Sequence, residues 1–285
     1  MPTGKGPNID VQHFRTIFIS DVHLGTKGCQ ADRLLGFLQR HTCDQLYLVG
    51  DIIDGWQIKS NFYWPESHME VVREILRHAK LNTSVTYVTG NHDEFLRKYS
   101  NAEFGALRLV DTATHETADG RKLLVIHGDQ FDVVTRYHKW VAVLGDIGYS
   151  ILLGLNNWLN WWRERFGYDH WSLSAWVKGK VKSAVNYLSN FETAVVKECQ
   201  RQKYDGVICG HIHHAEHRAF DDVEYYNCGD WVESCTALLE DESGKITVYK
   251  DTPPKSNITK IRVRKLRSFS KARRAAAASN DRTYR

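Results

Sequence analysis

Residues Arg15–Gly25 read RTIFISDVHLG, an apolar, β-rich run that ends on the polar triplet Asp-Val-His. The apolar part, Arg15–Ser20, predicts a strand covered on both faces. A helix is predicted next, over Ala31–Arg40, because its leucines fall on one face. The alternation of strand and helix then continues, with predicted strands at Gln45–Val49 and Ser84–Thr89 and a predicted helix at Glu66–Lys80. Strands that alternate with helices in this way indicate βαβ units and a largely parallel sheet.

The second half of the chain predicts a further sheet. Lys122–Ile126 is a predicted strand, and residues 131–202 then become helical in pattern and rich in Trp. Five short predicted strands follow, at Gly206–Cys209, Glu216–Phe220, Val223–Asn227, Ser234–Glu240 and Lys245–Lys250. Turn residues separate them, which favours an antiparallel arrangement. We therefore expect an α/β sandwich of two sheets, interrupted by a helical insertion.

The composition is that of an ordinary globular protein. Of 285 residues, 42% are hydrophobic and 25% are charged, which excludes a disordered, collagen-like or disulfide-scaffold chain. Six cysteines are far apart and form no Cys-x-x-Cys pair, so we expect reduced thiols. The N-terminal residues Met1–His13 are polar and lack an apolar core, so no secretory signal is predicted.

The charge is divided unevenly between the body of the chain and its C-terminal end. Residues 255–285 contain eleven Lys or Arg and one acid, Asp281, whereas the rest carries 27 basic and 33 acidic side chains. This basic tail is expected to be mobile. Binding to anionic lipid, contact with nucleic acid and a solvated extension all remain open, although no aromatic side chains of the base-stacking type accompany these charges. No specific nucleic-acid partner is expected.

Five clusters of metal-binding residue types follow predicted strands. They are Asp21-Val22-His23, Gly50-Asp51-Ile52-Ile53-Asp54, Gly90-Asn91-His92-Asp93, His127-Gly128-Asp129 and Gly210-His211-Ile212-His213. Ligands of α/β sheets bind beyond the strand ends, so these loops are expected to converge. A glycine before three of the clusters lets the backbone turn sharply toward an ion.

The candidate ligands mix carboxylate, amide and imidazole groups and include no thiolate. They are Asp21, His23, Asp51, Asn91, His127, His211 and His213. The set is too large for one tetrahedral zinc ion but sufficient for two ions that share a carboxylate, and it favours Mn²⁺, Fe or Zn²⁺. With two divalent ions, two carboxylates and a hydroxide, a net charge of about +1 remains to attract a phosphate oxygen. The sequence therefore predicts hydrolysis of a phosphate ester or anhydride.

With these residues in place, the chain resembles the calcineurin-like metallophosphoesterase superfamily. It matches the signature D-x-H, G-D-x-x-D, G-N-H-[DE], G-H and G-H-x-H across roughly residues 15–250. The resemblance implies a four-layer α/β/β/α sandwich and two metal ions, with Mn²⁺ favoured. It assigns residues 14–130 and 203–252 to the core, 131–202 to a helical, Trp-rich lid insertion and 253–285 to the tail. One ion would be held by Asp21, His23, Asp51 and His213, and the other by Asp51, Asn91, His127 and His211.

The resemblance also implies how the site would act. Asp51 would bridge the ions, and His92 would stabilise developing charge or protonate the leaving oxygen. Asp54 and Asp93 would orient His92 and other ligands. For Asp54, the alternative is a helix N-cap.

Four segments look like the UDP-2,3-diacylglucosamine pyrophosphatase group in particular. They are FISDVHLG (Phe18–Gly25), YLVGDIIDGW (Tyr47–Trp56), GNHDEF (Gly90–Phe95) and IHGDQFD (Ile126–Asp132). This implies cleavage of a glycolipid nucleotide to lipid X and UMP in lipid A biosynthesis, by a cytoplasmic protein that is peripheral on the inner membrane. One departure is His92, where the best-known members of the group have Arg. The alternative is a metallophosphoesterase for another, water-soluble phosphodiester, nucleotide or phosphomonoester.

A non-catalytic binding module that has kept only the sandwich is the third hypothesis. It predicts substituted ligand positions, whereas the ligand set is complete.

The insertion holds six of the nine tryptophans, at Trp140, Trp158, Trp161, Trp162, Trp171 and Trp176. A membrane span is rejected here because Asp146 and three asparagines interrupt the apolar stretch. A lid that lines an acyl groove and contacts an anionic membrane surface is expected, and simple packing is the alternative. Asn91, Arg136, Arg163 and Arg165 are the candidate substrate contacts, with Lys139 nearby, although the four basic residues also fit plain surface charge. The oligomeric state is not predicted.

Overall fold

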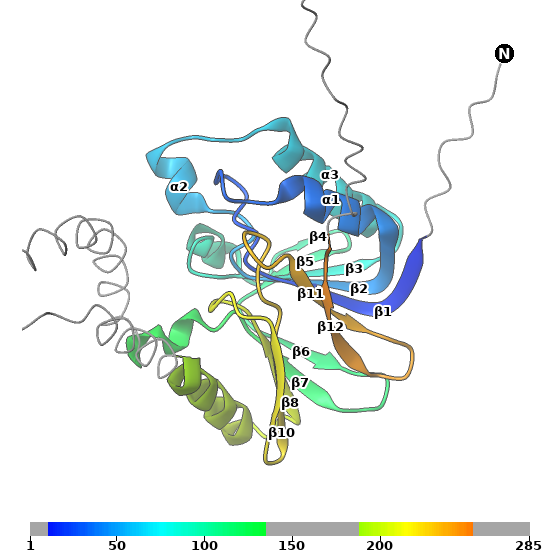
Figure 1. The fold of residues 1–285 in the computed structure, drawn as a ribbon, viewed down its shortest axis with the longest axis vertical. Coiled ribbons are helices and arrows are strands. Elements are labelled where there is room, and N and C mark those ends of the chain that lie inside the picture. Colours follow the sequence, from blue (N-terminus) through cyan, green and yellow to red (C-terminus); the bar gives the residue numbers. More distant parts are fainter. Residues whose placement is uncertain (1–10, 135–187, 253–285) are drawn as a thin grey trace, which may run out of the picture. The chain divides into compact units, whose positions relative to one another are not determined.

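Two β-sheets form the centre of the fold in the computed structural model, which describes residues 11–134 and 188–252 (Figure 1). Within these ranges the first sheet has seven strands in the order β12-β11-β1-β2-β3-β5-β4. They are β1 (Gln12–Ile19), β2 (His41–Val49), β3 (Ser84–Val88), β4 (Glu103–Phe104), β5 (Leu107–Val110), β11 (Thr236–Glu240) and β12 (Ile246–Lys250). Strands β1, β2, β3 and β5 pair in parallel, as predicted for the first third of the chain.

The second sheet has five strands in the described ranges, in the order β6-β7-β8-β10-β9. They are β6 (Ala113–Glu116), β7 (Lys122–Val125), β8 (Gly206–Cys209), β9 (Glu216–Phe220) and β10 (Val223–Asn227). The expected antiparallel arrangement is only partly right: β6–β7 and β9–β10 are antiparallel, but β8 pairs in parallel with both β7 and β10, and β11 and β12 join the first sheet. Turn residues specify the β9–β10 and β11–β12 hairpins, but they do not specify which strands these hairpins join.

Helices cover the outer face of the first sheet. The helices are α1 (Ala31–Arg40), α2 (Gly55–Ser60) and α3 (Glu66–Lys80), with the 3₁₀ turns η1 (Glu94–Tyr99) and η2 (Asp129–Val134). Helices α1 and α3 have the predicted bounds because each has an apolar face at helical spacing. Leu34 and Leu38 of α1 and Val71 of α3 pack in one buried cluster with the sheet residues Ile17 and Leu46.

The remaining two layers complete the sandwich. Between the sheets, Phe18 and Val88 of the first pack against Val125 and Ile208 of the second. Residues 188–201 are helical and pack on the outer face of the second sheet, where Val195 joins that sheet's outer cluster (Figure 1). The order is helix, sheet, sheet, helix, so the predicted four-layer α/β/β/α sandwich is confirmed.

The predicted insertion is described only at its ends. Residues 135–187 and 253–285 lie outside the described residues, as do the six clustered tryptophans, Arg136, Lys139, Arg163, Arg165 and the basic tail. Across the ranges that are described, no helix combines the length and apolarity needed to cross a bilayer. All six cysteines lie within these ranges and all are free, as the sequence predicted.

Candidate metal centre

The candidate ligands gather where parallel strands of both sheets end. The loop after β1 carries Asp21 and His23, and the loop after β2 carries Asp51. Asn91 follows β3, His127 follows β7, and His211 and His213 follow β8. A single pocket of about 420 Å³ is lined by five of these seven side chains, His23, Asp51, Asn91, His211 and His213, and also by His92. Strand ends from two sheets therefore meet around one space.

Five of the candidate ligands have a left-handed backbone. Asp21, His23, Asp51, His211 and His213 have φ angles from 50° to 71°. This conformation is uncommon for residues other than glycine and costs about 1–3 kcal/mol, so the surrounding structure must hold it. The loops after β1 and β2 do so for each other, since the N–H of Asp21 donates to Gly50 O at 3.1 Å and that of His23 to Asp51 O at 2.9 Å. The chain thus turns at the ligands themselves, directly after each strand.

Each ligand carboxylate uses one oxygen to bind a neighbouring loop. The His211 N–H donates to Asp21 Oδ2 at 2.9 Å, and the His92 N–H donates to Asp51 Oδ1 at 2.8 Å. These contacts require glycine next to them: a Cβ on Gly210 would lie 2.4 Å from Asp21 Oδ2, and a Cβ on Gly90 would lie 2.3 Å from Asp51 Oδ1. The other oxygen of each carboxylate faces the histidines.

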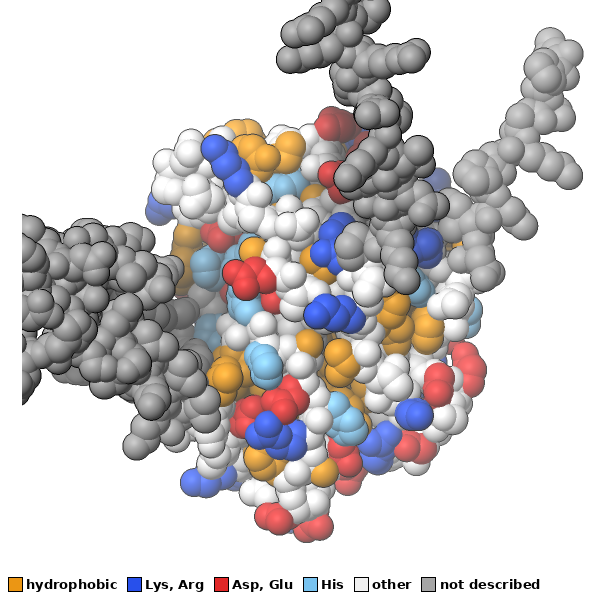
Figure 2. Space-filling model, viewed as in Figure 1, with side chains coloured by type: hydrophobic (Ala, Val, Ile, Leu, Met, Phe, Trp, Pro, Cys, Tyr) orange, Lys and Arg blue, Asp and Glu red, His pale blue; other side chains and the backbone are white. Residues whose placement is uncertain are grey.

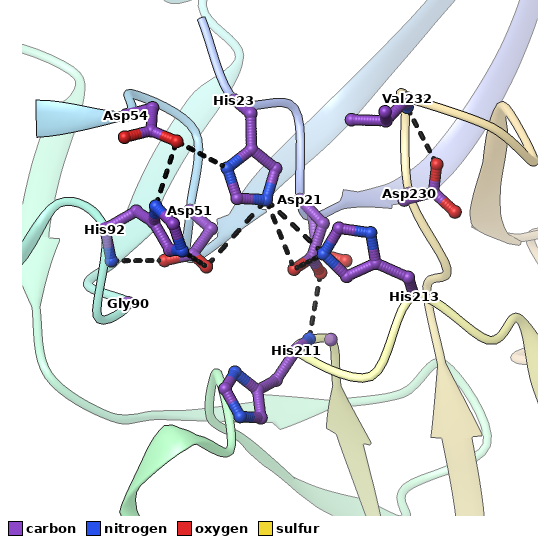
Figure 3. Close-up of polar contacts among 12 residues, drawn as sticks. Asp21, His23, Asp51, Asp54, Gly90, His92, His211, His213, Asp230 and Val232 are labelled. Atoms are coloured by element: carbon purple, nitrogen blue, oxygen red, sulfur yellow. Dashed lines mark hydrogen bonds and ion pairs between the residues drawn. The ribbon is translucent and has the colours of Figure 1, made fainter. Parts of the chain in front are cut away.

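These second oxygens form the centres of two groups (Figure 3). Asp21 Oδ1 lies 3.2 Å from His213 Nε2 and 4.0 Å from His23 Nε2. Asp51 Oδ2 lies 3.3 Å from His127 Nε2 and also 4.0 Å from His23 Nε2. The potential ligand atoms of Asp21, His23 and His213 all lie within 4.8 Å of one another, and so do those of Asp51, His127 and His211. Asp51 therefore lies between the two groups.

An independent observation supports the fit of this donor set to divalent cations. Among the described residues, Asp21 Oδ1, Asn91 Oδ1 and His127 Nε2 are buried and make no hydrogen bond of normal geometry. A buried polar atom without a partner costs about 1–3 kcal/mol, so a structure seldom keeps three in one place. Cations bound between these atoms would satisfy all three.

The electrostatics also favour positive charge at this point. Burial would raise the pKa of Asp21, but the nearby imidazoles of His213 and His127 outweigh it and lower the pKa. The same balance, with His127 as the main partner, lowers the pKa of Asp51. Burial would lower the pKa of His127, yet the Asp51 carboxylate raises it to about 10. The two carboxylates therefore attract positive charge at this point, which bound cations would supply.

Asp54 links a candidate ligand to the candidate catalytic histidine. Its Oδ2 atom accepts hydrogen bonds from His23 Nδ1 at 3.2 Å and from His92 Nδ1 at 2.9 Å (Figure 3). Its Oδ1 atom accepts from the Gln57 N–H at 2.7 Å and caps α2. Asp54 therefore combines the two alternatives: it orients His92, and it caps α2.

Asp93 has a different role from the one expected. Its carboxylate accepts hydrogen bonds from the N–H groups of Gly90 and Ile52 and from the Tyr87 hydroxyl, the last at 2.7 Å. It holds the backbone of the loops after β2 and β3 together, and His92 is oriented by Asp54 instead. The physical reason is burial: Asp93 is fully enclosed, whereas the His92 ring lies at the pocket.

Two residues of the pocket wall and one neighbour of His92 were not predicted from the sequence. Thr26 and Val232 line the pocket, and the Trp56 ring lies 4.3 Å from that of His92. Trp56 is 48% exposed, and its Nε1 donates to Glu94 at 3.2 Å. Its position two residues after Asp54, at the end of the segment YLVGDIIDGW, is the signal that points to it.

The centre is accessible from solvent. The side chain of His213 is 40% exposed and that of His92 is 23% exposed. In the space-filling view, several histidine side chains reach the surface on the face shown (Figure 2). A substrate can therefore approach these imidazoles directly.

Comparison with known proteins agrees with this geometry. The family model for calcineurin-like phosphoesterases matches residues 14–215. A UDP-2,3-diacylglucosamine hydrolase of Psychromonas ingrahamii is 26% identical over 230 residues, which cover 76% of this chain and 89% of that protein. Proteins of the same name from Chromohalobacter salexigens and Blochmanniella pennsylvanica are 32% and 30% identical over 143 and 117 residues. These two matches cover 45% and 40% of this chain and 56% and 46% of the relatives, so the chain spans about half the length of either one.

Solved structures give more distant matches. An archaeal phosphodiesterase has a TM-score of 0.41 at 14% identity, covering 83% of this chain and 99% of its own. Vacuolar Protein Sorting 29 from Cryptosporidium parvum has a TM-score of 0.40 at 12% identity, with coverage of 83% and 95%. The family match extends over most of the chain and includes all five loops that form the centre. The chain therefore belongs to the calcineurin-like phosphoesterase family of metal-dependent hydrolases.

Proposed function

We propose that the protein is a dinuclear-metal hydrolase that cleaves the diphosphate of UDP-2,3-diacylglucosamine to lipid X and UMP. The observation that carries the proposal is the convergence of seven candidate ligands from five loops around two carboxylates. The name of the relatives supports the substrate, above all the Psychromonas protein, which is aligned over 89% of its length.

Two divalent cations are part of the proposal, with Mn²⁺ favoured and Fe or Zn²⁺ as alternatives. Asp21, His23, Asp51 and His213 would hold one ion, and Asp51, Asn91, His127 and His211 would hold the other. When bound, such ions lower the pKa of water and neutralise charge on phosphate oxygens. Carboxylate, amide and imidazole donors without thiolate suit these metals.

The side chains beside the ions would hold the proton and transfer it to the leaving oxygen. Since Nδ1 of His92 donates to Asp54, the ring is held with Nε2 on the side of Asp51, 4.0 Å from its Oδ2. A proton on Nε2 would be available to the leaving oxygen, in the manner of a general acid. Trp56 covers the His92 ring and limits its contact with water.

The proposed substrate gives the insertion and a membrane surface a role. A substrate with two acyl chains needs an apolar groove, and residues 131–202 are proposed as the lid that provides it. Arg136, Arg163 and Arg165 are proposed to contact the diphosphate, together with Asn91 in the described pocket. Such an enzyme would be cytoplasmic, with peripheral contact to the anionic surface of the inner membrane.

One observation favours a second candidate function. His92 occupies the position where the best-known glycolipid pyrophosphatases have Arg. An imidazole at this place serves proton transfer to many leaving groups, whereas a guanidinium remains charged and binds a diphosphate. The alternative is hydrolysis of a different, water-soluble phosphodiester, nucleotide or phosphomonoester by the same centre.

A direct comparison of substrates separates the two candidates. Mn²⁺-loaded full-length protein is assayed for UMP release from UDP-2,3-diacylglucosamine in detergent, and in parallel for cleavage of bis(p-nitrophenyl) phosphate. The proposal predicts a much higher kcat/KM for the glycolipid. Asp51→Asn is the matched inactive control for both substrates. Cleavage of the small diester alone would overturn the glycolipid assignment and support the alternative.

A further inference from the structure

The helix that follows residues 135–187 reaches the metal-binding loops. Phe191 lies near the start of helical residues 188–201 and is 1% exposed. Its ring lies 5.9 Å from the His211 ring at an interplanar angle of 34°, and the His211 ring lies 5.1 Å from that of His127 at 77°. Phe191 thus begins a row of three rings, of which the other two are candidate ligands of the same ion.

The same phenyl ring supports the backbone of the loop after β7. Gly128 has a φ of +112°, and a Cβ at this position would lie 2.7 Å from Phe191 Cζ. The loop after β8 is bound to this loop, because the Gly210 N–H donates to His127 O at 3.1 Å. Phe191 therefore contacts both loops that carry His127 and His211.

Phe191 is itself fixed in position. The next residue, Glu192, is buried and accepts a hydrogen bond from Arg218 Nη1 of β9 at 2.8 Å. From the other side, the Phe131 ring of η2 meets Phe191 edge-on, with 6.5 Å between ring centroids. A side chain held from both sides in this way provides a rigid surface for the His211 ring.

The other proposed ion has different neighbours. The His23 ring lies 5.2 Å from that of His213 and 4.7 Å from that of His92. His23 is oriented by Asp54 rather than by an aromatic side chain of the helix. The imidazole rings of the two ligand groups are therefore oriented by different side chains, although the His211 N–H also binds Asp21.

We propose that Phe191 is a positioning residue that sets the affinity for one of the two metal ions, the one assigned to His127 and His211. This inference rests on the proposed dinuclear centre and deepens it. With the phenyl ring removed, the His211 ring and the Gly128 loop lose a packing contact, and the ion must then do more to order them on binding. Changes to groups that orient metal ligands typically weaken metal affinity about 10- to 100-fold.

The test is a titration of metal-free, full-length protein with Mn²⁺ by calorimetry. Wild type is expected to bind two ions. Phe191→Leu retains apolar volume but lacks the flat ring, and it is expected to raise one dissociation constant about tenfold while the other stays within about twofold. Phe191→Ala is expected to have a larger effect of the same kind.

Two further variants make the result specific. Val195→Ala lies one turn along the same helix, is equally buried in the same cluster, and is expected to leave both dissociation constants unchanged. His213→Ala is expected to weaken the other ion, which identifies the dissociation constant that belongs to that ion.

Each outcome is decisive. If folded Phe191→Leu binds both ions as wild type does, the positioning role is wrong although the dinuclear centre stands. Equal weakening of both ions, or the same loss in Val195→Ala, also overturns the role. If wild type binds fewer than two ions, both this inference and the proposed function fail. Should Phe191→Ala not fold, Phe191→Leu carries the test by itself.

Discussion

Nδ1 of His92 donates a hydrogen bond to Oδ2 of Asp54 across 2.9 Å. An ionised carboxylate is an acceptor only, so the proton on this side of the imidazole is fixed at Nδ1. The same carboxylate oxygen accepts a hydrogen bond from Nδ1 of His23 at 3.2 Å. One oxygen atom thus sets the tautomer of the proposed general acid and of a proposed metal ligand.

The first prediction concerns Asp54→Asn. Asparagine is as good a helix N-cap as aspartate, so α2 is expected to remain. Its amide is neutral and has only one acceptor oxygen, so an oxygen that caps α2 leaves the NH₂ group facing two histidine N–H donors in their present tautomers. Turnover is expected to fall about 10- to 100-fold, with weaker binding of the ion that His23 holds. Steady-state kinetics and metal analysis check this, with Asp222→Asn in the exposed β9–β10 turn as the control. An unchanged kcat would show that Asp54 acts on α2 alone.

The second prediction concerns His92→Ala. Loss of a proton-transfer group is expected to lower turnover about 10²- to 10⁴-fold. His92 is outside the proposed ligand set, so metal content is expected to remain at the wild-type level. Adding Asp54→Asn to this variant is expected to cost less than it does in wild type, because its partner His92 is then missing. Retained turnover in His92→Ala would remove the imidazole from the mechanism.

The third prediction concerns Gly90→Ala. A Cβ at Gly90 would lie 2.3 Å from Asp51 Oδ1 and 2.6 Å from the Asp51 backbone nitrogen. Asp51 must then move, so metal affinity is expected to fall about tenfold or more and stability to drop by about 1–3 kcal/mol. Gly36→Ala in α1 is the control: its Cβ meets the flexible end of Arg40 at 3.0 Å, and a helix interior gains about 0.5–1 kcal/mol from alanine. Equal behaviour of the two variants would contradict the close approach at Gly90.

The sequence predicts those parts of the fold that have a local cause. The faces of α1 and α3 repeat at helical spacing, so their bounds followed from the residues alone. Strands β4 to β6 were not predicted, because residues 103–116 mix glycine, charge and short apolar pairs. Strand β5 forms by pairing with β3, while β4 and β6 form short hairpins with β5 and β7, so these strands depend on their neighbours rather than on their own local pattern.

The same distinction applies to the candidate site, where residue types could be predicted locally but the contacts that support them could not. The ligand residues were recognisable by type and by their place at strand ends. The left-handed backbone of Asp21 and His23 was not, because hydrogen bonds to a loop far away in sequence hold it. Supporting residues were also missed: Trp231 is fully buried, and its backbone N–H donates to Asp21 O at 3.0 Å. An aromatic residue in a loop gives no indication of which backbone it supports.

A buried carboxylate that joins the two sheets should make stability depend on pH. Glu240 of β11 is fully buried and receives hydrogen bonds from His115 Nε2 of β6 at 2.7 Å and from the Ala118 N–H at 2.9 Å. Arg15 Nε lies 3.3 Å from the same carboxylate. Burial alone would raise the pKa of Glu240, but the hydrogen bonds from His115 and Ala118 outweigh it and lower the pKa below its ordinary value of 4.5.

The fourth prediction follows from the sign of that shift. A carboxyl whose pKa is lower in the folded chain stabilises it above the ordinary pKa and loses this effect as the pH falls through the folded value. Glu240→Gln is therefore expected to reduce the free energy of unfolding by about 3 kcal/mol at pH 7, and by progressively less below about pH 4. Urea unfolding of metal-free protein at several pH values measures the difference. Glu242→Gln, in the exposed β11–β12 turn, is expected to change little at any pH. A deficit for Glu240→Gln that stays constant from pH 7 to pH 3.5 would mean that the shape of this side chain, rather than its charge, joins the sheets.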